Sequence, residues 1–342
     1  MTAARASVVP ATLAAIAAGI GIAVQTSING HANVEVGSPV LATAINHGSA
    51  LTLSLIVALA MGAFPRAVRS LRANRAQVRW WWFLGGIMGL AGVMSIIAVT
   101  PQLGVVVVAV AVTLGQLAGS IIADSGGLGP AGKRPLTMLR IAGVGVAIVA
   151  VGAGAFGRFE PENLWVIPVV IVAGVIIAIQ QAFNGWLVVV TGEFSIMSVI
   201  NFTVSFFFVA IAVVVATLIQ PLDFTAIPLW SPLGGFIGAI VGVISALTLR
   251  IVGVLTAVLC IAAGQAIGGI VMDLLLPVDA LGLTAGSIIG AVLAVVAVGL
   301  AGLGGITARR RDRRARSDAA ADAAADADAA ALHARTIAAL GA

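Results

Sequence analysis

The sequence predicts an all-α integral membrane protein with ten transmembrane helices, arranged as two inverted five-helix repeats with both termini in the cytoplasm. Three observations lead to this prediction: the composition, the number of long apolar segments, and a duplication that relates the two halves of the chain. Hydrophobic residues make up 61% of the chain and charged residues only 9%. A soluble domain carries about 25% charged residues. Because so few charges cannot cover a water-facing surface, most of the chain is expected to lie in lipid.

Ten apolar segments are long enough to cross a bilayer, which takes roughly 20 residues of α-helix. They fall at about 8–29, 38–62, 80–100, 102–124, 136–156, 163–188, 195–219, 231–250, 251–276 and 282–304. Pro101 is expected to break the helix between the third and fourth segments, and the eighth and ninth divide near Arg250. The first segment follows a single basic residue, Arg5, and is expected to be a retained helix rather than a signal peptide.

The distribution of Lys and Arg predicts the orientation, since cytoplasmic loops of membrane proteins carry an excess of both. With both termini inside, 17 of the 18 basic residues face the cytoplasm and only Arg158 faces out. The opposite orientation reverses that count. Six tryptophans near the ends of the segments are expected to anchor the helices at the interfaces: Trp80, Trp81, Trp82, Trp165, Trp186 and Trp230.

Residues 305–342 differ from the rest of the chain. A basic cluster is followed by DAAADAAADADAAALHAR, which has no apolar face to bury, so a disordered or loosely helical cytoplasmic tail is expected. The cluster Arg309–Arg316 is expected to contact anionic lipid headgroups. The other basic residues fall in short gaps between apolar segments, and without a folded basic domain nucleic-acid binding is excluded.

The chain contains a five-span unit written twice, at 8–156 and 163–304. LGQLAGSIIAD at 114–124 returns as AGQAIGGIVMD at 263–273, an offset of 149, and QTSING at 25–30 returns as QQAFNG at 180–185, an offset of 155. Because five is an odd number, the second unit enters the membrane from the opposite side and the two halves are inverted. Inverted repeats are the architecture of many secondary transporters.

These motifs also resemble those of a known family. QTSING, GSPVLATAIN, GQLAGSIIAD and GKRPL are similar to the YdcZ-type inner-membrane exporters of the drug/metabolite transporter superfamily, over nearly all of residues 10–304. The resemblance implies an EamA-like fold, a bacterial-type inner membrane and outward movement of a small organic solute. Many members resemble one five-span unit, whereas this chain resembles a fused pair. Related small multidrug exporters exchange protons through a glutamate of the first helix, where this chain has Gln25, which cannot titrate.

Amides repeated within apolar segments are the candidate pathway residues. Depth estimated from the start of each segment puts one group toward the outer half (Gln25, Asn29, Asn46 and Gln265) and another toward the inner half (Gln116, Gln180, Gln181, Asn184 and Asn201). An amide both donates and accepts, so each group can bond to itself when closed and to water or solute when open. We hypothesise an outer and an inner gate that flank a central cavity. The alternative is that these amides form only interhelical hydrogen bonds.

No carboxylate lies in the middle of a predicted span, so transport is expected either to be facilitative or to use His47, Asp124 or Asp273 for protons. His47 also belongs to the candidate pathway, and histidine is the side chain whose unperturbed titration lies near neutrality. Asp124 is alternatively expected to cap a helix or to pair with Lys133 or Arg134. Four glycine pairs at i,i+4 spacing are expected to let helices approach closely: Gly85/Gly89, Gly115/Gly119, Gly234/Gly238 and Gly264/Gly268.

Other functions are less well supported by the sequence. The histidines have no Cys or carboxylate at ligand spacing, so neither a metal site nor a cofactor is expected. G-x-S-x-G, H-E-x-x-H and P-loop motifs are absent from the sequence, so we do not expect an enzyme. A non-transport scaffold or sensor, and an intramembrane enzyme, remain the alternatives to a transporter. The expected partners are a small-molecule substrate and lipid, and a homo-oligomer stays open.

Overall fold

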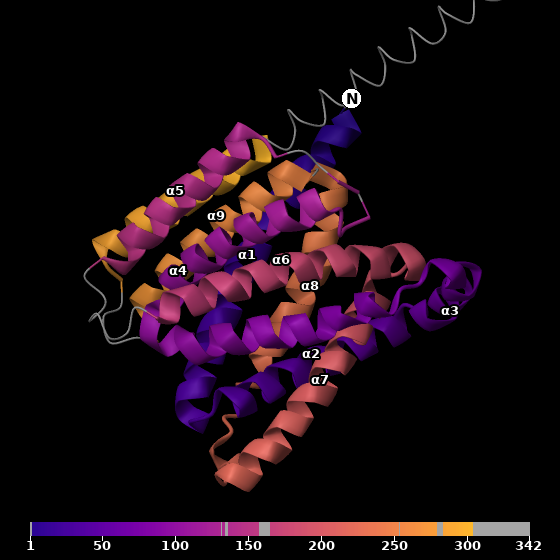
Figure 1. Ribbon diagram of the computed structural model, residues 1–342, viewed down its shortest axis with the longest axis horizontal. Helices are drawn as coiled ribbons and strands as arrows, with labels where there is room; N and C mark the ends of the chain where they lie inside the picture. Colours follow the sequence, from indigo (N-terminus) through magenta and orange to yellow (C-terminus); the bar gives the residue numbers. More distant parts are fainter. Residues whose placement is uncertain are drawn as a thin grey trace, which may run out of the picture.

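The computed structural model describes residues 2–130, 132–133, 136–156, 165–252, 254–278 and 283–303. All regular secondary structure in these ranges is helical (Figure 1). Eight of the described helical segments are long and apolar enough to cross a membrane. The structure therefore confirms an all-α membrane protein. The predicted tail 305–342, with Arg309–Arg316, and the loop residue Arg158 lie outside the described residues.

The helices follow the order of the predicted spans. Their bounds are α1 Thr2–Val36, α2 Pro39–Ala60, α3 Ala63–Ala73, α4 Gly85–Gly126, α5 Met138–Ala155, α6 Val166–Thr191, α7 Phe194–Ile219, α8 Pro232–Val252 and α9 Val254–Leu275. A last long helix, Ala285–Leu303, follows α9. Short 3-10 turns lie at Arg75–Gln77 (η1), Trp80–Leu84 (η2) and Phe224–Ala226 (η4). α8 is described as far as Val252 and α9 from Val254, so the expected division near Arg250 falls beside a residue, 253, that lies outside the described ranges.

The turn between α1 and α2 shows how the local sequence ends one helix and starts the next. Gly37 has a φ of 62°, a left-handed conformation that costs glycine little. The Ser38 hydroxyl then accepts a hydrogen bond of 3.3 Å from the Leu41 N–H and caps α2. The equivalent turn before α7 also contains a left-handed glycine, Gly192, with a φ of 71°. A tight reversal thus follows the first helix of each half.

α4 contains a break at Gly104, where φ is 72° and ψ is 164°. The expectation of a break at Pro101 is wrong by three residues, because Pro101 stays helical. A proline holds φ near −65°, which suits a helical turn. A change of chain direction here takes a positive φ, which glycine adopts at little cost because it has no Cβ.

The two arms of α4, residues 85–103 and 105–126, run in opposite directions. The first arm runs antiparallel to α6, and the second arm runs parallel to it. The contacts that show this are Gly85 with Asn184 and Gly92 with Ile177 for the first arm, and Gly115 with Gly174 and Gly119 with Ala178 for the second. The stretch Trp80–Gly126 has 47 residues, far more than the roughly 20 that one crossing needs. It therefore holds two antiparallel segments of membrane-spanning length.

The two halves of the chain pack into each other. α1 packs against α8 and α9, whereas α6 packs against both arms of α4. A Cβ on Gly19 of α1 would meet Gly264 of α9, and a Cβ on Gly174 of α6 would meet Gly115 of α4. These contacts are related by the offsets of 155 and 149 found in the repeated motifs. The first helix of each half thus buries its small-residue face on the third and fourth segments of the other half, and the two arrangements are equivalent.

α5 and the last helix, Ala285–Leu303, lie side by side along one flank of the bundle (Figure 1). A Cβ on Gly143 would lie 2.7 Å from the Ala297 carbonyl oxygen, and a Cβ on Gly290 would lie 2.7 Å from the Ala150 carbonyl oxygen. The pair is therefore antiparallel and closely packed. Beneath it, the valine-rich second arm of α4 forms the most deeply buried part of the core.

Candidate functional site

The first group of amides joins α1, α2 and α8, toward the end of the bundle opposite α3. Asn46 Nδ2 donates a hydrogen bond of 3.0 Å to Asn29 Oδ1. A Cβ on Gly234 of α8 would collide with Asn29 Oδ1, and a Cβ on Gly238 would lie 2.5 Å from Gln25 Nε2. The two glycines of α8 therefore make room for the amides of α1. These five residues are called the Asn29 cluster below.

The second group of amides joins α6, α7 and the first arm of α4, toward the end that carries α3. Asn201 Nδ2 donates a hydrogen bond of 2.6 Å to Asn184 Oδ1. A Cβ on Gly85 would lie 3.1 Å from the Oδ1 atoms of both asparagines, and a Cβ on Gly89 would collide with Gln180. These five residues are called the Asn184 cluster.

The two clusters are equivalent through the repeat. Each takes its amides from the first two helices of one half and its glycines from the third segment of the other half, residue for residue at the offsets of 155 and 149. From the sequence, the glycines were expected to pack helix against helix, and the amides were considered separately. The structure joins them, because each of these glycines faces an amide side chain.

The asparagines of both clusters are buried, with exposed fractions between 2% and 8%. A buried amide is costly unless its polar atoms are paired. Asn201 Oδ1 is buried and accepts no hydrogen bond from the described part of the chain. Asn201 Nδ2 donates a second hydrogen bond, of 3.1 Å, to Met197 Sδ. The Asn184 cluster therefore has one unused acceptor at its centre.

The glutamines of the duplicated GQ motif lie at a different level from the two clusters. The backbone nitrogen of Gln265 would be 2.8 Å from a Cβ on Gly19, six residues before Gln25 on α1. Six residues span about 9 Å of helix. Gln116 has the same relation to Gly174 of α6. The sequence placed Gln265 at the depth of Gln25 and Gln116 at the depth of Gln180. That estimate was wrong by about 9 Å, because the helices do not start at the same level.

Gln265 instead lines a small cavity of about 10 Å³ with Thr113 of α4 and Ala291 of the last helix. This is about the room that one water needs. Gln181, next to Gln180 on α6, is exposed. The structure thus gathers six of the nine candidate amides into the two clusters and places three elsewhere.

His47 lies where α2 meets α7. Its side chain is 2% exposed, and Nδ1 lies 3.1 Å from the Thr43 carbonyl oxygen, to which it must donate because a carbonyl only accepts. The ring packs edge to face on Phe202, with centroids 5.9 Å apart and an interplanar angle of 73°. No charged side chain takes part in these contacts.

Asp273 stabilises the break in α4. Its carboxylate accepts hydrogen bonds of 2.8 Å from the Val105 N–H and 2.9 Å from the Val106 N–H, and the residue is 1% exposed. These are the first free N–H groups of the second arm, just after Gly104. A carboxylate at a helix N-terminus satisfies unpaired donors and faces the positive end of the helix dipole.

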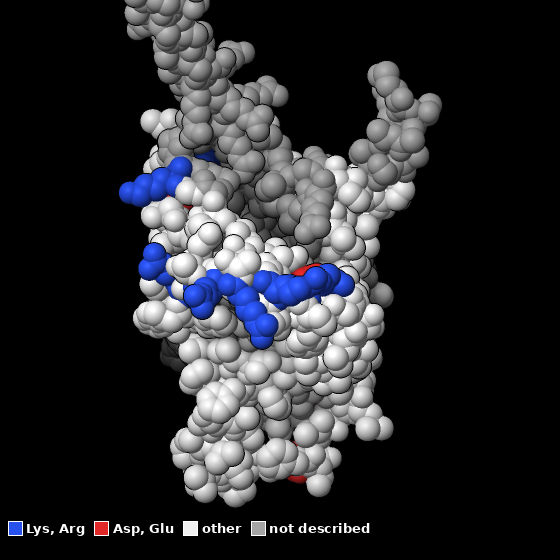
Figure 2. All heavy atoms as spheres, turned by 90° about the vertical axis from the view of Figure 1, so that its right-hand side faces the viewer, with Lys and Arg blue, Asp and Glu red and all other residues white. Residues whose placement is uncertain are grey.

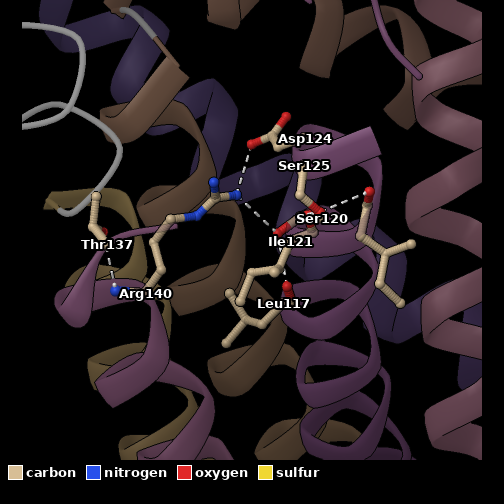
Figure 3. Close-up of polar contacts among 8 residues, drawn as sticks. Leu117, Ser120, Ile121, Asp124, Ser125, Thr137 and Arg140 are labelled. Atoms are coloured by element: carbon tan, nitrogen blue, oxygen red, sulfur yellow. Dashed lines mark hydrogen bonds and ion pairs between the residues drawn. The ribbon is translucent and has the colours of Figure 1, made fainter. Parts of the chain in front are cut away.

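Asp124, the repeat equivalent of Asp273, has a different partner. Arg140 of α5 donates through Nη2 to Asp124 Oδ2 at 2.7 Å and approaches Ser120 Oγ at 3.4 Å (Figure 3). Asp124 therefore pairs with Arg140 rather than with the expected Lys133, and Arg134, the other expected partner, lies outside the described residues. Arg140 lies in the first turn of α5 and is held over Asp124 by the packing of that helix. Its side chain is only 10% exposed, so the pair is largely removed from water.

The described basic side chains gather at one end of the bundle, called the basic end below. They are Arg66, Arg69, Arg72, Arg75, Arg79, Lys133 and Arg140. Figure 2 looks onto this end and shows Lys and Arg side chains in a band across it. Trp82 and Trp186 stack here with ring centroids 5.1 Å apart.

An ion pair at the basic end ties α3 to the turn between α6 and α7. Arg66 donates through Nε to Glu193 Oε1 and through Nη1 to the Met61 carbonyl oxygen at 2.9 Å. The hydrogen bond from Arg66 lowers the pKa of the Glu193 carboxyl below its ordinary value. Ser70 of α3 also donates 2.9 Å to the Val190 carbonyl oxygen of α6. Sequence reasoning missed this pair because its members lie 127 residues apart.

A cavity of about 180 Å³ lies between α2, α7 and α8 toward the basic end. Its walls are apolar apart from three hydroxyl groups, those of Ser54, Ser195 and Ser198. Among the described residues, no group of three His, Cys, Asp or Glu side chains is placed to hold a metal ion. The serines were not among the sequence candidates, since single serines within apolar helices carry no recognisable spacing.

Comparisons with known proteins agree with this architecture. A family model described as "Putative inner membrane exporter, YdcZ" matches residues 10–153 and 165–300, one region in each half of the chain. No curated protein matches the chain. A solved structure described only as "Crystal structure of protein" is 18% identical with a TM-score of 0.51, and the match covers 86% of this chain and 98% of that one. That likeness shows a shared fold. Because the family model covers most of the chain, the protein belongs to the YdcZ family of inner-membrane exporters and is a multi-pass protein of that membrane.

Proposed function

We propose that the protein exports a small organic solute as a secondary transporter, by alternating access between two inverted halves, 8–156 and 163–304. The observation that carries the proposal is the pair of equivalent amide clusters, one toward each end of the bundle. Polar groups inside a membrane are costly and tend to mark pathways for solutes. A scaffold that needed only stable packing could repeat the glycines without the amides.

Ten membrane crossings are the count that the arrangement of helices supports. The eight candidate segments include α4 once, and its antiparallel arms count as two crossings. α8, with 21 residues, adds the tenth. Its equivalence to the first arm of α4 supports this, since both present paired glycines to an amide cluster.

The proposed orientation has the basic end in the cytoplasm, as Lys and Arg enrichment indicates. α1 runs from the basic end to the Asn29 cluster. The last helix runs antiparallel to α5, which begins at the basic end near Arg140, so Leu303 lies at that end too. Both termini are therefore proposed to be cytoplasmic, with the Asn184 cluster as the inner gate and the Asn29 cluster as the outer gate.

In the proposed mechanism each gate holds three helices together through one asparagine pair and two glycines that face amide side chains. Opening of the Asn29 cluster lets α8 move away from α1 and α2, and opening of the Asn184 cluster lets the first arm of α4 move away from α6 and α7. The freed amides then bond to water or solute. Because the two clusters are equivalent, closing one while opening the other exchanges the conformations of the halves.

Of the three candidate proton carriers, His47 is the one we propose for coupling. The Asp273 carboxylate is occupied by two backbone N–H groups, and the Asp124 carboxylate is occupied by Arg140. These contacts support structural roles for both acids. His47 lies between the halves at the contact of α2 with α7, where a change of charge would act on both.

Thiol labelling tests the proposal without knowledge of the substrate. In a Cys260→Ala background, Gln25→Cys and Gln180→Cys report on the two clusters in oriented vesicles. Asn46→Ala should raise labelling at position 25 from outside and lower labelling at position 180 from inside. Each change in labelling is expected to be roughly threefold, because the lost interhelical hydrogen bond is worth about 0.6 kcal/mol.

The second half provides the matched control. Asn201→Ala should produce the reverse pattern, raising labelling at position 180 and lowering it at position 25. If each alanine raises labelling only at the nearby cysteine and leaves the distant one unchanged, the clusters are separate packing contacts and the proposal of coupled gates fails.

A further inference from the structure

The cavity between α2, α7 and α8 has walls from both halves of the chain. Ser54 comes from α2, Ser195 and Ser198 from α7, and Ala239 and Ile240 from α8. The first residue of α2 that lines the cavity is Leu53, six residues after His47, or about 9 Å of helix closer to the basic end. The cavity thus lies on the cytoplasmic side of the contact between the halves.

The chemistry of the cavity is simple. The residues that line it are aliphatic or serine, and none carries an ionisable group. Ser195 is 7% exposed, and its Oγ is buried without a hydrogen-bond partner in the described part of the chain. A buried hydroxyl left unpaired costs free energy, so a ligand that pairs with it regains that free energy on binding. The Oγ itself has almost no accessible surface, so pairing with a ligand in the cavity requires the side chain to rotate about its Cα–Cβ bond.

Three positions that line the cavity have larger side chains at the equivalent positions of the other half. At offsets of 155 and 149, Val209 stands for Ser54, Thr43 for Ser198 and Leu90 for Ala239. Val209 and Thr43 are 0% exposed and Leu90 is 8% exposed. Smaller side chains at these three positions leave room on the cytoplasmic side, whereas Val57, Ile240 and Ile244 are larger than their equivalents Ala212, Ala91 and Ser95.

We propose that this cavity binds the transported molecule, and that this molecule is uncharged, with an apolar body of about one ring and a single hydroxyl or carbonyl group that pairs with Ser195. The inference rests on the proposed transport function and names the class of its substrate. A cavity of roughly 150 Å³ with apolar walls holds one benzene molecule, so about 180 Å³ holds a ring with one or two further heavy atoms. An ion would lie here without a counter-charge, at high cost.

Four probes of one shape test this class on the purified full chain: benzyl alcohol, toluene, benzylammonium and benzoate. The measured quantity is the shift of unfolding temperature with probe concentration, followed by tryptophan fluorescence. Benzyl alcohol should stabilise the protein in a saturable way. Toluene should bind more weakly, and the two ions should produce no saturable shift.

Two kinds of variant assign the effect to the cavity. Ala239→Leu copies Leu90 of the other half and should abolish the shift by benzyl alcohol, whereas Ala142→Leu on the exposed face of α5 should leave it unchanged. Ser198→Thr copies Thr43 and gives a milder filling variant if Ala239→Leu unfolds. Ser195→Ala should weaken the binding of benzyl alcohol about fivefold, the effect of losing one neutral hydrogen bond, and should leave the affinity for toluene unchanged.

Every outcome decides the point. An equal shift in Ala239→Leu and Ala142→Leu overturns the site. Equal binding of toluene and benzyl alcohol overturns hydroxyl recognition and makes a hydrocarbon chain from the bilayer the occupant. Saturable binding of either ion overturns the uncharged class. The reciprocal labelling described above is independent of the probes, so its failure counts against the gates, while loss of binding with labelling intact counts against this site alone.

Discussion

His47 and Phe202 occupy equivalent positions in the two halves, 155 residues apart, and their rings contact each other with centroids 5.9 Å apart. Two equivalent residues can touch only near the axis that exchanges them, as in the isologous interface of a symmetric dimer. The pair therefore marks the pseudo-two-fold axis between α2 and α7. It is also a place where the halves differ in chemistry, because an imidazole faces a phenyl ring.

His47→Phe should remove the pH dependence of the gates and keep the fold. The variant copies the residue of the other half, and because a phenyl ring is larger than the buried imidazole it replaces, a cost of about 1–3 kcal/mol is expected. The measurement is the labelling ratio of Gln25→Cys to Gln180→Cys against pH. A pH dependence that survives the substitution would assign the proton to another group, and Phe202→Tyr serves as the control at the same contact.

Gly89→Ala and Gly238→Ala should each destabilise the protein by roughly 1–3 kcal/mol, because the added methyl group displaces a glutamine amide. Unfolding in mixed detergent measures the free energy. Gly145→Ala on α5 is the control, since a Cβ there meets nothing within 4 Å, and it should be neutral or slightly stabilising.

Double variants test whether the displaced glutamine amide causes this loss of stability. Gln180→Ala should make Gly89→Ala tolerable, and Gln25→Ala should do the same for Gly238→Ala. Losses that simply add in the double variants would show that the glycines do not act through the amides.

Asp273→Asn should destabilise the protein by roughly 1.5–3 kcal/mol, and Asp273→Ala should destabilise it further. Asparagine keeps one acceptor for Val105 or Val106, whereas alanine leaves both N–H groups of the second arm without this carboxylate. The free energy of unfolding of the two variants checks this order. Equal losses, or none, would mean that the break at Gly104 does not depend on the carboxylate.

The Arg66–Glu193 pair should stabilise the protein at neutral pH and lose that effect in acid. The pKa of Glu193 is lowered in the folded protein by the hydrogen bond from Arg66, so its contribution is present above the unfolded pKa and lost as pH falls through the folded pKa. The difference in unfolding temperature between the wild type and Glu193→Gln should shrink toward zero over that range.

A second exposed acid gives the control for this pH effect. The pKa of Asp223, at the opposite end, is lowered by hydrogen bonds from Thr225. Asp223→Asn should leave the contact between α3 and the turn before α7 unchanged, as measured by thiol labelling at Ser70→Cys. A pH response of that contact in Glu193→Gln equal to that of the wild type would remove Glu193 from the explanation.

Reporter fusions test the orientation. Fusions after Arg75 and after residue 316 should report a cytoplasmic location, and a fusion near Glu160 should report an external one, because Lys and Arg are retained inside. An external result after Arg75 would invert the assignment of inner and outer gates and leave the clusters themselves unaffected.

Much of the fold follows from local sequence. The apolar segments predict most helices because length and hydropathy alone decide whether a helix can cross a membrane. The break in α4 was misplaced at Pro101, since proline is the obvious helix breaker in the sequence. Gly104 is one of 41 glycines, and nothing local distinguishes it. Its role depends on Asp273, which lies 168 residues after Val105, the first residue of the second arm.

By itself the sequence determined that the protein lies in the membrane, that it is duplicated, and that asparagines and glycines recur at fixed offsets. Those properties depend on composition and on the order of residues along one chain. Only the tertiary structure decided that Gly234 faces Asn29, that Gly85 faces Asn184, and that small residues of α8 leave a cavity beside Ser195. These contacts arise between helices whose relative height and rotation are set by packing against the whole bundle. No single segment carries that information.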